Sequence, residues 1–411
     1  MRLLIFLCLV LSACAGAPVE QSPPPIAVSY HVVAVDDAAD SFGDGSDRPV
    51  LPASTAKLMT ALAVLDFAPP NATFKTHLCR NGDTLALLGG GDPSFDVEDM
   101  LALAMKAQDD LDGVTAFTYA PAGLYGSINS RQPADAAYNP QLAHLMVAEG
   151  AYRGHRAEDG SGWTVPDGAP IPAEPGTDWY AHSDPPRQAA DLFRFYAQGL
   201  GIDLPAPQPG EIECDRLIAR QDSPPLSALV GEMLWTSSNP MAEMLGRFTL
   251  GVPDAGQWLE FRHPEISGFA LTNFSGLDAA SRLTPRAMAT LLATEAGRVA
   301  GDTPFPAMLT PAGWDGGLKH RMQEPPLALA VWAKTGTMQY GVGLAGYLMV
   351  PGKGLHAVAL YAFDEEKRRV YDAAVLDPSP EMEADAKAWR DRARAAIDAT
   401  AGQIYERLLA N

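Results

Sequence analysis

The chain has 411 residues, which is enough for two or more domains with sizeable hydrophobic cores. Hydrophobic residues make up 47% of it and charged residues 19%, as in ordinary globular proteins. The 30 Lys and Arg residues against 50 Asp and Glu residues give a net charge of −20, and the cations form no run. Because binding to nucleic acid needs clustered cations opposite the phosphates, this charge argues against a nucleic-acid partner.

The first residues indicate export. A charged start precedes an apolar stretch at residues 3–11, which is too short to span a bilayer as a mature helix. The Leu-Ser-Ala-Cys that ends at Cys14 resembles the lipobox of bacterial lipoproteins, in which the cysteine becomes the lipidated first residue. We therefore predict a signal peptide at 1–13, a lipid anchor to the membrane on Cys14, a proline-rich tether at 14–25 and a location in the periplasm. Ordinary signal cleavage after the small residues 15–17 is the alternative.

Four cysteines are present; Cys8 lies in the predicted signal peptide and Cys14 would carry the lipid. The other two, Cys79 and Cys214, are an even pair in an oxidising compartment, which favours a disulfide over two buried free thiols. Neither a Cys-x-x-Cys nor a His-Glu-x-x-His occurs, so we expect no metal site and no cofactor.

Apolar periodicity, prolines and turn residues predict the elements in chain order. The first part has a strand at 26–35, a turn-rich connection at 36–47, a helix from Ser54 to about Phe67, short strands at 84–88 and 114–119, and an amphipathic helix at 179–201 broken at Pro185-Pro186. The second part has helices that begin near 226, 237 and 284, strands at 331–335, 345–350 and 356–361, with 341–343 joining the first two strands, and a closing helix at 381–409. Strands and helices are therefore mixed along the chain.

Ser54 and Lys57 form a Ser-x-x-Lys at the start of a predicted apolar helix. Positions i and i+3 share one face of a helix, so the two side chains would lie side by side. A serine becomes an effective nucleophile when a base takes its proton, and an amine whose pKa is lowered by burial or by a second cation can be that base. The helix N-terminus would also place positive dipole beside the forming alkoxide. The alternative is a solvated lysine one turn past a helix-capping serine.

A Lys-Thr-Gly lies on one of the predicted strands, in the run Lys334-Thr335-Gly336-Thr337. Strand alternation would place Lys334 and Gly336 on one face and the two threonines on the other. Gly336 has no side chain, so a substrate backbone could approach it closely. The alternative for Lys334 is a solvated lysine on an edge strand.

Ser237 and Asn239 form a Ser-x-Asn at the start of a predicted helix. Ser127 and Asn129 form a rival motif, but they lie among turn residues and a surface turn explains them. Helix capping is the alternative for Ser237. The order Ser-x-x-Lys, Ser-x-Asn, Lys-Thr-Gly is that of serine β-lactamases and penicillin-binding proteins, so the three motifs together predict a serine acyl-transfer site.

Several further segments match the motifs of a single enzyme family. With the nucleophile motif included, they are Pro52-Ala-Ser-Thr-Ala-Lys-Leu58, Gly89-Gly-Gly-Asp-Pro93, Ser223-Pro-Pro-Leu226, Ser275-Gly-Leu277, Leu283-Thr-Pro-Arg286, Gly316-x-Leu318 and Ala333-Lys-Thr-Gly-Thr337. From about residue 26 onward the chain is thereby similar to the D-alanyl-D-alanine carboxypeptidase/endopeptidase family, the class C low-molecular-mass penicillin-binding proteins. Family members commonly have Asp-Gly-Ser-Gly-Leu where this chain has Asn273-Phe274-Ser275-Gly276-Leu277, so the chain departs from the family at that loop.

The resemblance implies a fold of the α/β (α+β) class. It implies a DD-peptidase/serine β-lactamase-like domain, in which an antiparallel sheet is flanked by helices and joined by an all-helical subdomain. Residues 26–70 and 221–411 would form this penicillin-binding domain. Residues 71–220 would be the large mixed α/β insertion between the Ser-x-x-Lys and Ser-x-Asn motifs that distinguishes the family, shorter here than in its larger members.

The resemblance also implies acyl transfer through a serine ester, on peptidoglycan peptides that end in D-Ala-D-Ala, with β-lactams as covalent inhibitors. The implied roles are Ser54 as nucleophile, Lys57 as base kept neutral by the charge of Lys334, Ser237 as proton relay to the leaving amine, Asn239 as ligand of the substrate amide, and Lys334, Thr335, Gly336 and Thr337 as the substrate-binding strand. The backbone N–H groups of Ser54 and Thr337 would form the oxyanion hole. Two alternatives stay open, a serine β-lactamase and a non-catalytic, penicillin-binding lipoprotein that senses the wall.

Overall fold

The structure is a computed structural model that describes residues 25–121, 126–165, 171, 175–210 and 213–410. The predicted signal peptide, the lipidated Cys14 and nearly all of the tether lie outside these residues. Within them, no helix combines the length and the apolar character that crossing a membrane requires.

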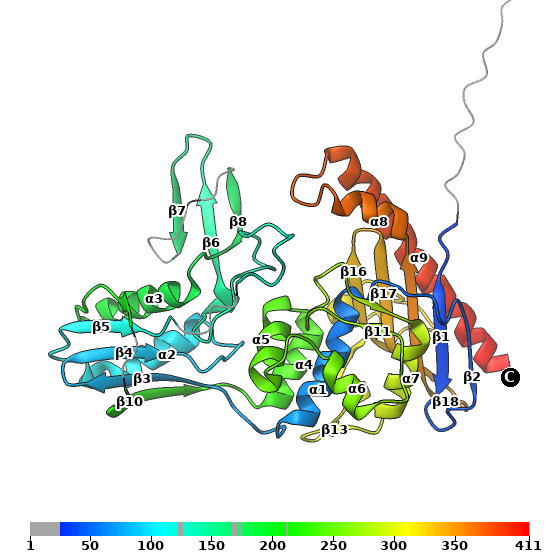
Figure 1. Ribbon diagram of the computed structural model, residues 1–411, viewed down its shortest axis with the longest axis horizontal. Coiled ribbons are helices and arrows are strands. Elements are labelled where there is room, and N and C mark those ends of the chain that lie inside the picture. The colour runs from blue at the N-terminus through cyan, green and yellow to red at the C-terminus, as the bar shows by residue number, and fades with distance from the viewer. Residues whose placement is uncertain (1–24, 122–125, 166–170, 172–174, 211–212, 411) are drawn as a thin grey trace, which may run out of the picture.

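A six-stranded antiparallel sheet lies at the centre of one lobe, on the right in Figure 1. Its strand order is β15-β16-β17-β18-β1-β2, so the first strands of the chain pair with the last. The bounds are β1 Ser29–Ala34, β2 Ser41–Asp44, β15 Thr310–Pro311, β16 Val331–Met338, β17 Gly341–Val350 and β18 Gly354–Phe363.

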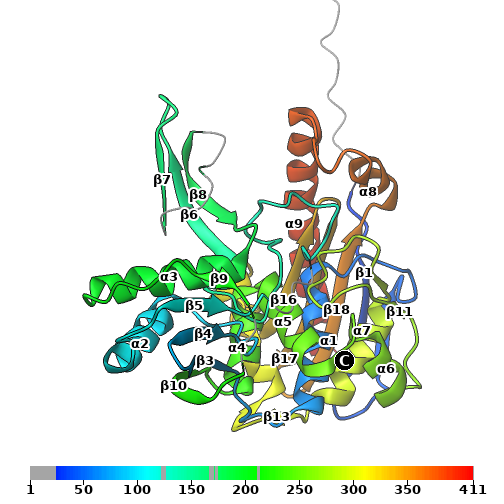
Figure 2. The same cartoon turned by 60° about the vertical axis from the view of Figure 1, so that its left-hand side comes forward.

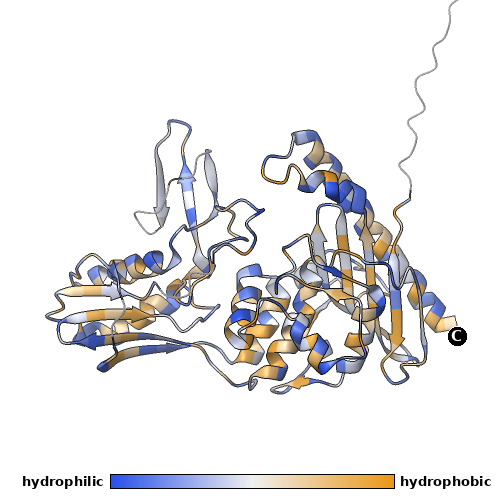
Figure 3. Ribbon diagram, in the orientation of Figure 1, coloured by the Kyte–Doolittle hydropathy of each residue, from blue (hydrophilic) through white to orange (hydrophobic). Residues whose placement is uncertain are grey.

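Both faces of this sheet are buried, which explains the almost continuous apolar run of β17. Along that strand, Val342 and Leu344 enter one hydrophobic core while Ala345 and Tyr347 enter the other. The long helix α9 (Pro380–Ala410) covers the first face with an apolar stripe that includes Trp389, and its polar side faces outward (Figure 3).

Helices cover the second face. The bounds are α1 Ala56–Phe67, α4 Leu226–Thr236, α5 Asn239–Leu250, α6 Gly256–Arg262 and α7 Pro285–Glu295, with α8 Glu365–Asp372 preceding α9. Helix α1 is enclosed between the sheet and the neighbouring helices, so every residue from Ala56 to Val64 is buried. Thr284 caps α7 through the N–H of Ala287, and Pro285 occupies the first turn, as the sequence predicts.

The other lobe is built from the segment between α1 and α4. It holds a five-stranded sheet of order β10-β3-β4-β5-β9 with helices α2 and α3, and a three-stranded sheet of order β7-β6-β8 that stands above α3 in Figures 1 and 2. The bounds are β3 Lys75–Asn81, β4 Thr84–Leu88, α2 Val97–Ala107, β5 Ala116–Tyr119, β6 Ala151–Arg156, β7 Gly162–Val165, β8 Gly176–Ala181, α3 Pro185–Gly199, β9 Gln208–Pro209 and β10 Arg216–Asp222.

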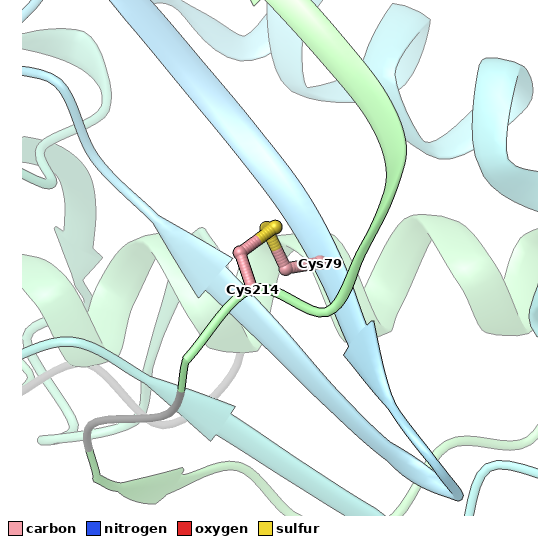
Figure 4. Close-up of a disulfide and its surroundings, with 2 residues drawn as sticks. All are labelled: Cys79 and Cys214. Atoms are coloured by element: carbon pink, nitrogen blue, oxygen red, sulfur yellow. A yellow bond between two sulfur atoms is a disulfide. The ribbon is translucent and has the colours of Figure 1, made fainter.

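A disulfide joins Cys79 to Cys214 in this lobe (Figure 4). Cys79 lies on β3, and Cys214 precedes β10, which pairs with β3 in antiparallel register. The bridge links positions 135 residues apart and so fastens the end of the segment to its beginning.

Short elements complete the fold. They are the two-residue strands β11 Phe269–Ala270, β12 Arg282–Leu283, β13 Val299–Ala300 and β14 Thr303–Pro304, and the 3-10 turns η1 Ala53–Thr55, η2 Gln108–Asp110, η3 Ala148–Gly150, η4 Phe305–Met308 and η5 Gly316–Leu318.

Three expectations on local structure were wrong. The helix predicted at 179–201 starts only at Pro185, because Trp179 belongs to β8 and pairs with Arg153 of β6. Its two prolines begin the helix instead of breaking it, since the first turn needs no N–H donors.

The other two concern connections. The connection at 36–47 contains the strand β2, and residues 341–343 lie inside β17 while Gln339 and Tyr340 form the turn before it. Glycine-rich sequence misled the second prediction, because these glycines allow close packing of a central strand: a Cβ on Gly343 would lie 2.6 Å from the ring of Tyr361.

Candidate active site

Ser54 lies in the 3-10 turn η1 that leads into α1, half-buried, while Lys57 is fully buried one turn later. Thr55 fixes the turn, because its Oγ1 donates to the carbonyl of Pro52 at 2.7 Å and lies 3.0 Å from the hydroxyl of Tyr361. Lys57 Nζ lies 3.0 Å from Ser54 Oγ. The adjacency that the Ser-x-x-Lys predicts is therefore present, although α1 proper begins only at Ala56.

Lys57 Nζ makes two further hydrogen bonds, to Asn239 Oδ1 at 2.7 Å and to the carbonyl of Ser275 at 2.8 Å. A neutral amine has two N–H donors and one lone pair, so these two acceptors take both donors and leave the lone pair for the hydroxyl proton of Ser54. Burial lowers the pKa of Lys57 well below its usual range, and the charge of Lys334 lowers it further. The nearby carboxylates of Glu243 and Glu149 oppose this shift.

Lys334 is 3% exposed, which removes the alternative of a solvated edge lysine. Its Nζ donates to Ser237 Oγ at 2.8 Å and to the carbonyl of Thr335 at 3.0 Å. Burial lowers its pKa to about 7. Lys57 therefore binds Asn239 and Lys334 binds Ser237, so the Ser-x-Asn motif links the other two motifs at one site.

Ser237 and Asn239 come from the junction of α4 and α5. Ser237 has a positive φ of 62° as the C-cap of α4, and Asn239 is the first residue of α5, where Ser238 caps the helix through the N–H of Met241. The residue that caps the N-terminus of α5 is therefore Ser238, and not Ser237 as the alternative interpretation had it. The unusual backbone at Ser237 turns its hydroxyl toward Lys334.

One edge of β16 is open beside this cluster. The short strand β15 pairs with β16 only at Trp332 and Ala333, and the carbonyls of Val331 and Ala333 accept hydrogen bonds from that side. Because the N–H and C=O groups of alternate residues in a strand point to the same side, those of Thr335 and Thr337 point to this edge as well. In the described part of the chain no strand pairs with this edge beyond Ala333.

The side chains of Thr335 and Thr337 are half-buried and exposed, respectively, on the strand face opposite Lys334 and Gly336. Gly336 faces the protein: a Cβ there would lie 2.5 Å from the carbonyl oxygen of Pro52. The missing side chain therefore lets β16 lie against the turn that carries Ser54.

The loop that departs from the family pattern supports Lys57. Its Ser275 carbonyl accepts the hydrogen bond from Lys57, and Asn273 Oδ1 accepts one from the N–H of Gly276 at 3.0 Å. Gly276 has a φ of 76°, and a Cβ there would lie 1.9 Å from the carbonyl oxygen of Ala53. Phe274 is fully buried against Gly246 of α5, where any Cβ would lie 2.3 Å from its ring.

Sequence reasoning missed two groups of residues at the site. Glu243 is fully buried on α5 and binds the backbone of the same loop. The only signal for it was its spacing of four from Asn239, which places both on one helix face. The second group comes from the other lobe: the carbonyl of Tyr138 accepts a hydrogen bond from Asn239 Nδ2 at 3.2 Å, and Glu149 bonds to Ser238.

The rival motif is structural. Asn129 Oδ1 accepts the N–H of Arg131 within a turn, and its Nδ2 donates to the carbonyl of Leu277 at 3.1 Å. Among the residues that the structure describes, no group of three or more His, Cys, Asp or Glu side chains is placed to hold a metal ion.

Comparison with known proteins gives a family and two relatives. The D-alanyl-D-alanine carboxypeptidase of Actinomadura sp. (strain R39) is 26% identical, over 78% of this chain and 75% of that protein. Carboxypeptidase Rv3627c of Mycobacterium tuberculosis is 29% identical, over 74% of this chain and 68% of that protein.

Two solved structures share the fold. Penicillin binding protein 4 (dacB) from Haemophilus influenzae has a TM-score of 0.66 at 17% identity and covers 86% of this chain and 97% of its own. A predatory endopeptidase from Bdellovibrio bacteriovorus, solved with an immunity protein, has a TM-score of 0.55 at 16% identity and covers 90% of this chain and 93% of its own. The model of the D-Ala-D-Ala carboxypeptidase 3 (S13) family matches residues 24–151 and 153–363, so the chain belongs to that family, as the resemblance in its sequence predicted.

Proposed function

We propose that this protein is a serine-type D-Ala-D-Ala carboxypeptidase, endopeptidase or both, which acts on peptidoglycan peptides through an acyl-enzyme on Ser54. One observation carries the proposal: Lys57 Nζ is buried within hydrogen-bond distance of Ser54 Oγ while a second buried lysine holds Ser237. Membership of the S13 family supports the same activity.

In the first step Ser54 Oγ attacks the carbonyl carbon of the penultimate D-Ala, and its proton passes to neutral Lys57. The tetrahedral oxyanion forms between the backbone N–H groups of Ser54 and Thr337, the second of which points to the open edge of β16. Each such donor is worth about 3 kcal/mol of barrier lowering.

Collapse of the intermediate expels the amine of the terminal D-Ala, and the proton that Lys57 took from Ser54 passes through Ser237 to this amine. Asn239 binds the substrate amide, the hydroxyls of Thr335 and Thr337 bind the terminal carboxylate, and the charge of Lys334 supplies a favourable field. Water then attacks the ester, Lys57 takes its proton and returns it to Ser54 Oγ as the ester bond breaks, and the shortened peptide leaves. The peptide extends along the open strand edge, which offers backbone hydrogen bonds to an added strand.

β-Lactams would acylate Ser54 in the same way. A structure of penicillin binding protein 4 from Haemophilus influenzae was solved with a bound β-lactam, and its fold is that of this chain. We also propose that residues 1–13 are removed, that Cys14 carries a lipid and that the protein acts in the periplasm; the support is the sequence around Cys14. The division into a penicillin-binding domain at 26–70 and 221–411 and an insertion at 71–220 belongs to this proposal.

The test compares wild type with Ser54→Ala. We expect a fluorescent penicillin to label only the wild type, and only the wild type to release D-Ala from a D-Ala-D-Ala peptide or to cut cross-linked muropeptides, as followed by mass spectrometry. Label lost within seconds would instead indicate a β-lactamase. Stable labelling without any peptide cleavage would indicate a wall-sensing lipoprotein.

A further inference from the structure

A buried carboxylate holds the loop that receives Lys57. Glu243 Oε1 accepts the N–H of Ser275 at 2.9 Å and that of Phe274 at 3.1 Å. Its Oε2 accepts Nε of Arg247, one turn later on α5, at 3.1 Å. Glu243 is 0% exposed, so all of these bonds are shielded from water and would be costly to lose.

Two further hydrogen bonds, both from α1, hold the loop at Phe274 and Ser275. Thr60 of α1 donates to the carbonyl of Phe274 at 2.7 Å, and Lys57 donates to that of Ser275 at 2.8 Å. The two peptide groups are thus bound on their N–H side by α5 and on their C=O side by α1. Since Asn239 begins the helix that carries Glu243, one helix positions both of the oxygens that Lys57 binds besides Ser54 Oγ.

We propose that Glu243 is a positioning residue for acylation, which fixes the Ser275 carbonyl so that Lys57 Nζ directs its lone pair at Ser54 Oγ. The proposal rests on the proposed role of Lys57 as base. Glu243 lies behind the loop and touches neither Ser54 nor the open edge of β16.

Charge gives this role a measurable signature. The charged groups that act on Lys57 are Lys334 from β16, Glu243 from α5 and Glu149 from η3. Removing the carboxylate of Glu243 takes away one of the two negative charges that favour the ammonium. The pKa of Lys57 then falls further, because the cation Lys334 stays.

Two variants separate charge from position. Glu243→Gln keeps an oxygen that can accept both N–H groups but loses the charge and the bond from Arg247, whose partly exposed side chain can turn to water, so we expect its plateau rate of penicillin acylation to stay near that of wild type. Its rate should rise with pH at a lower pH than in wild type, since Lys57 loses its proton earlier. Glu243→Ala frees the loop as well, and we expect its plateau rate of acylation to be about 100-fold slower, the scale of a misplacement of about 1 Å.

Glu295 offers a matched control. It is a buried carboxylate on α7 that binds Nε of Arg298 at 2.6 Å, and it is absent from the groups that act on Lys57. We expect Glu295→Gln to lower thermal stability and to leave both the acylation rate and its pH profile unchanged.

Single-turnover acylation rates are compared with burst amplitudes, because an unfolded fraction lowers the amplitude and not the rate constant. Wild-type rates and pH profiles in both Glu243 variants would overturn the proposal. If Glu243→Ala does not fold, Glu243→Asp replaces it, because it keeps the charge but is one methylene too short to hold the loop, and a wild-type acylation rate in that variant overturns the proposal. Absence of Ser54-dependent labelling in the wild type would instead defeat the proposed function.

Discussion

The two lobes differ in how they surround their polar groups. In the lobe of the six-stranded sheet, α1 and β16 each bury a lysine at the site, and helices close both faces of the sheet. The lobe of Cys79 and Cys214 has a smaller core and carries Trp163 and Trp179 largely exposed. Among its described residues, Tyr138 and Glu149 contact Asn239 and Ser238 at the site.

This difference indicates which lobe determines the reactivity of the site. Burial lowers the pKa of a lysine by removing its charge from water, and the sheet lobe buries both lysines of the site. The sheet lobe therefore sets the reactivity of Ser54, while the other lobe contributes contacts at the rim. The predictions below test this division.

The largest effect should follow from Ser54→Ala, which removes the nucleophile. We expect peptide hydrolysis to fall by roughly 10⁴-fold or more, the range seen when a serine nucleophile is removed. Steady-state release of D-Ala measures it. Unchanged circular dichroism would show that the fold is intact, and appreciable remaining activity would place the chemistry elsewhere.

Lys57→Met should come next, since it removes the base but retains much of the buried volume. We expect Ser54 acylation to slow by about 10² to 10⁴-fold, the contribution of a general base. Rapid-mixing experiments with a penicillin give the rate constant. A drop of less than tenfold, with the pH–rate profile of wild type, would show that another group takes the proton.

Lys334 should produce a pH effect of moderate size. Its pKa is lowered to about 7, so its charge is lost as the pH rises through 7, and KM for a peptide carboxylate should increase above that pH. In Lys334→Gln we expect a high KM that no longer varies there. Because the unfolded state binds more protons than the folded state between about 7 and the ordinary value of 10.5, this lysine should also make stability rise with pH over that interval.

Glu149→Gln should have a smaller effect, because Glu149 bonds to Ser238 and otherwise acts on Lys57 only as the weakest of the three charges around it. We expect acylation to change two- to fivefold, about the worth of one hydrogen bond. The same penicillin assay measures it. A change as large as that of Lys57→Met would mean that the second lobe controls the chemistry.

Removing the disulfide should affect acylation least. In a Cys79→Ala, Cys214→Ala double variant we expect a loss of about 2–5 kcal/mol in the stability of the lobe that it closes. Acylation of Ser54 should be unchanged, because the bridge lies outside the buried site. Thermal unfolding and penicillin labelling of the same sample test both parts, and slower labelling would show that the lobes are coupled.

The sequence predicts much of this arrangement, because short motifs carry it. Ser54 and Lys57 are neighbours on any helix. The strand that contains Lys334 is predicted from an apolar run without helical periodicity. Glu243 could not be found in that way, since its partners are backbone N–H groups, and any residue supplies those. The need for a glycine at Gly336 could not be predicted either, because it comes from close packing against the turn at Pro52.

Trp179 shows the opposite failure. Its surroundings fit a helical pattern, yet pairing with Arg153 makes it part of a strand. Long-range pairing overrode local preference there. The Asn273-Phe274 departure also needed the fold, because Phe274 fits only where α5 has a glycine, at Gly246.

The place of β1 in the sheet has a consequence for biosynthesis. This strand is made first, but its partner β18 is made more than three hundred residues later. The nucleophile turn that follows β1 must wait in an incomplete core, while residues 75–222 can pair and oxidise among themselves. We therefore expect chain termination before β18 to yield a folded, disulfide-bonded lobe attached to a disordered, inactive remainder, and folding to be slow for a chain of this length.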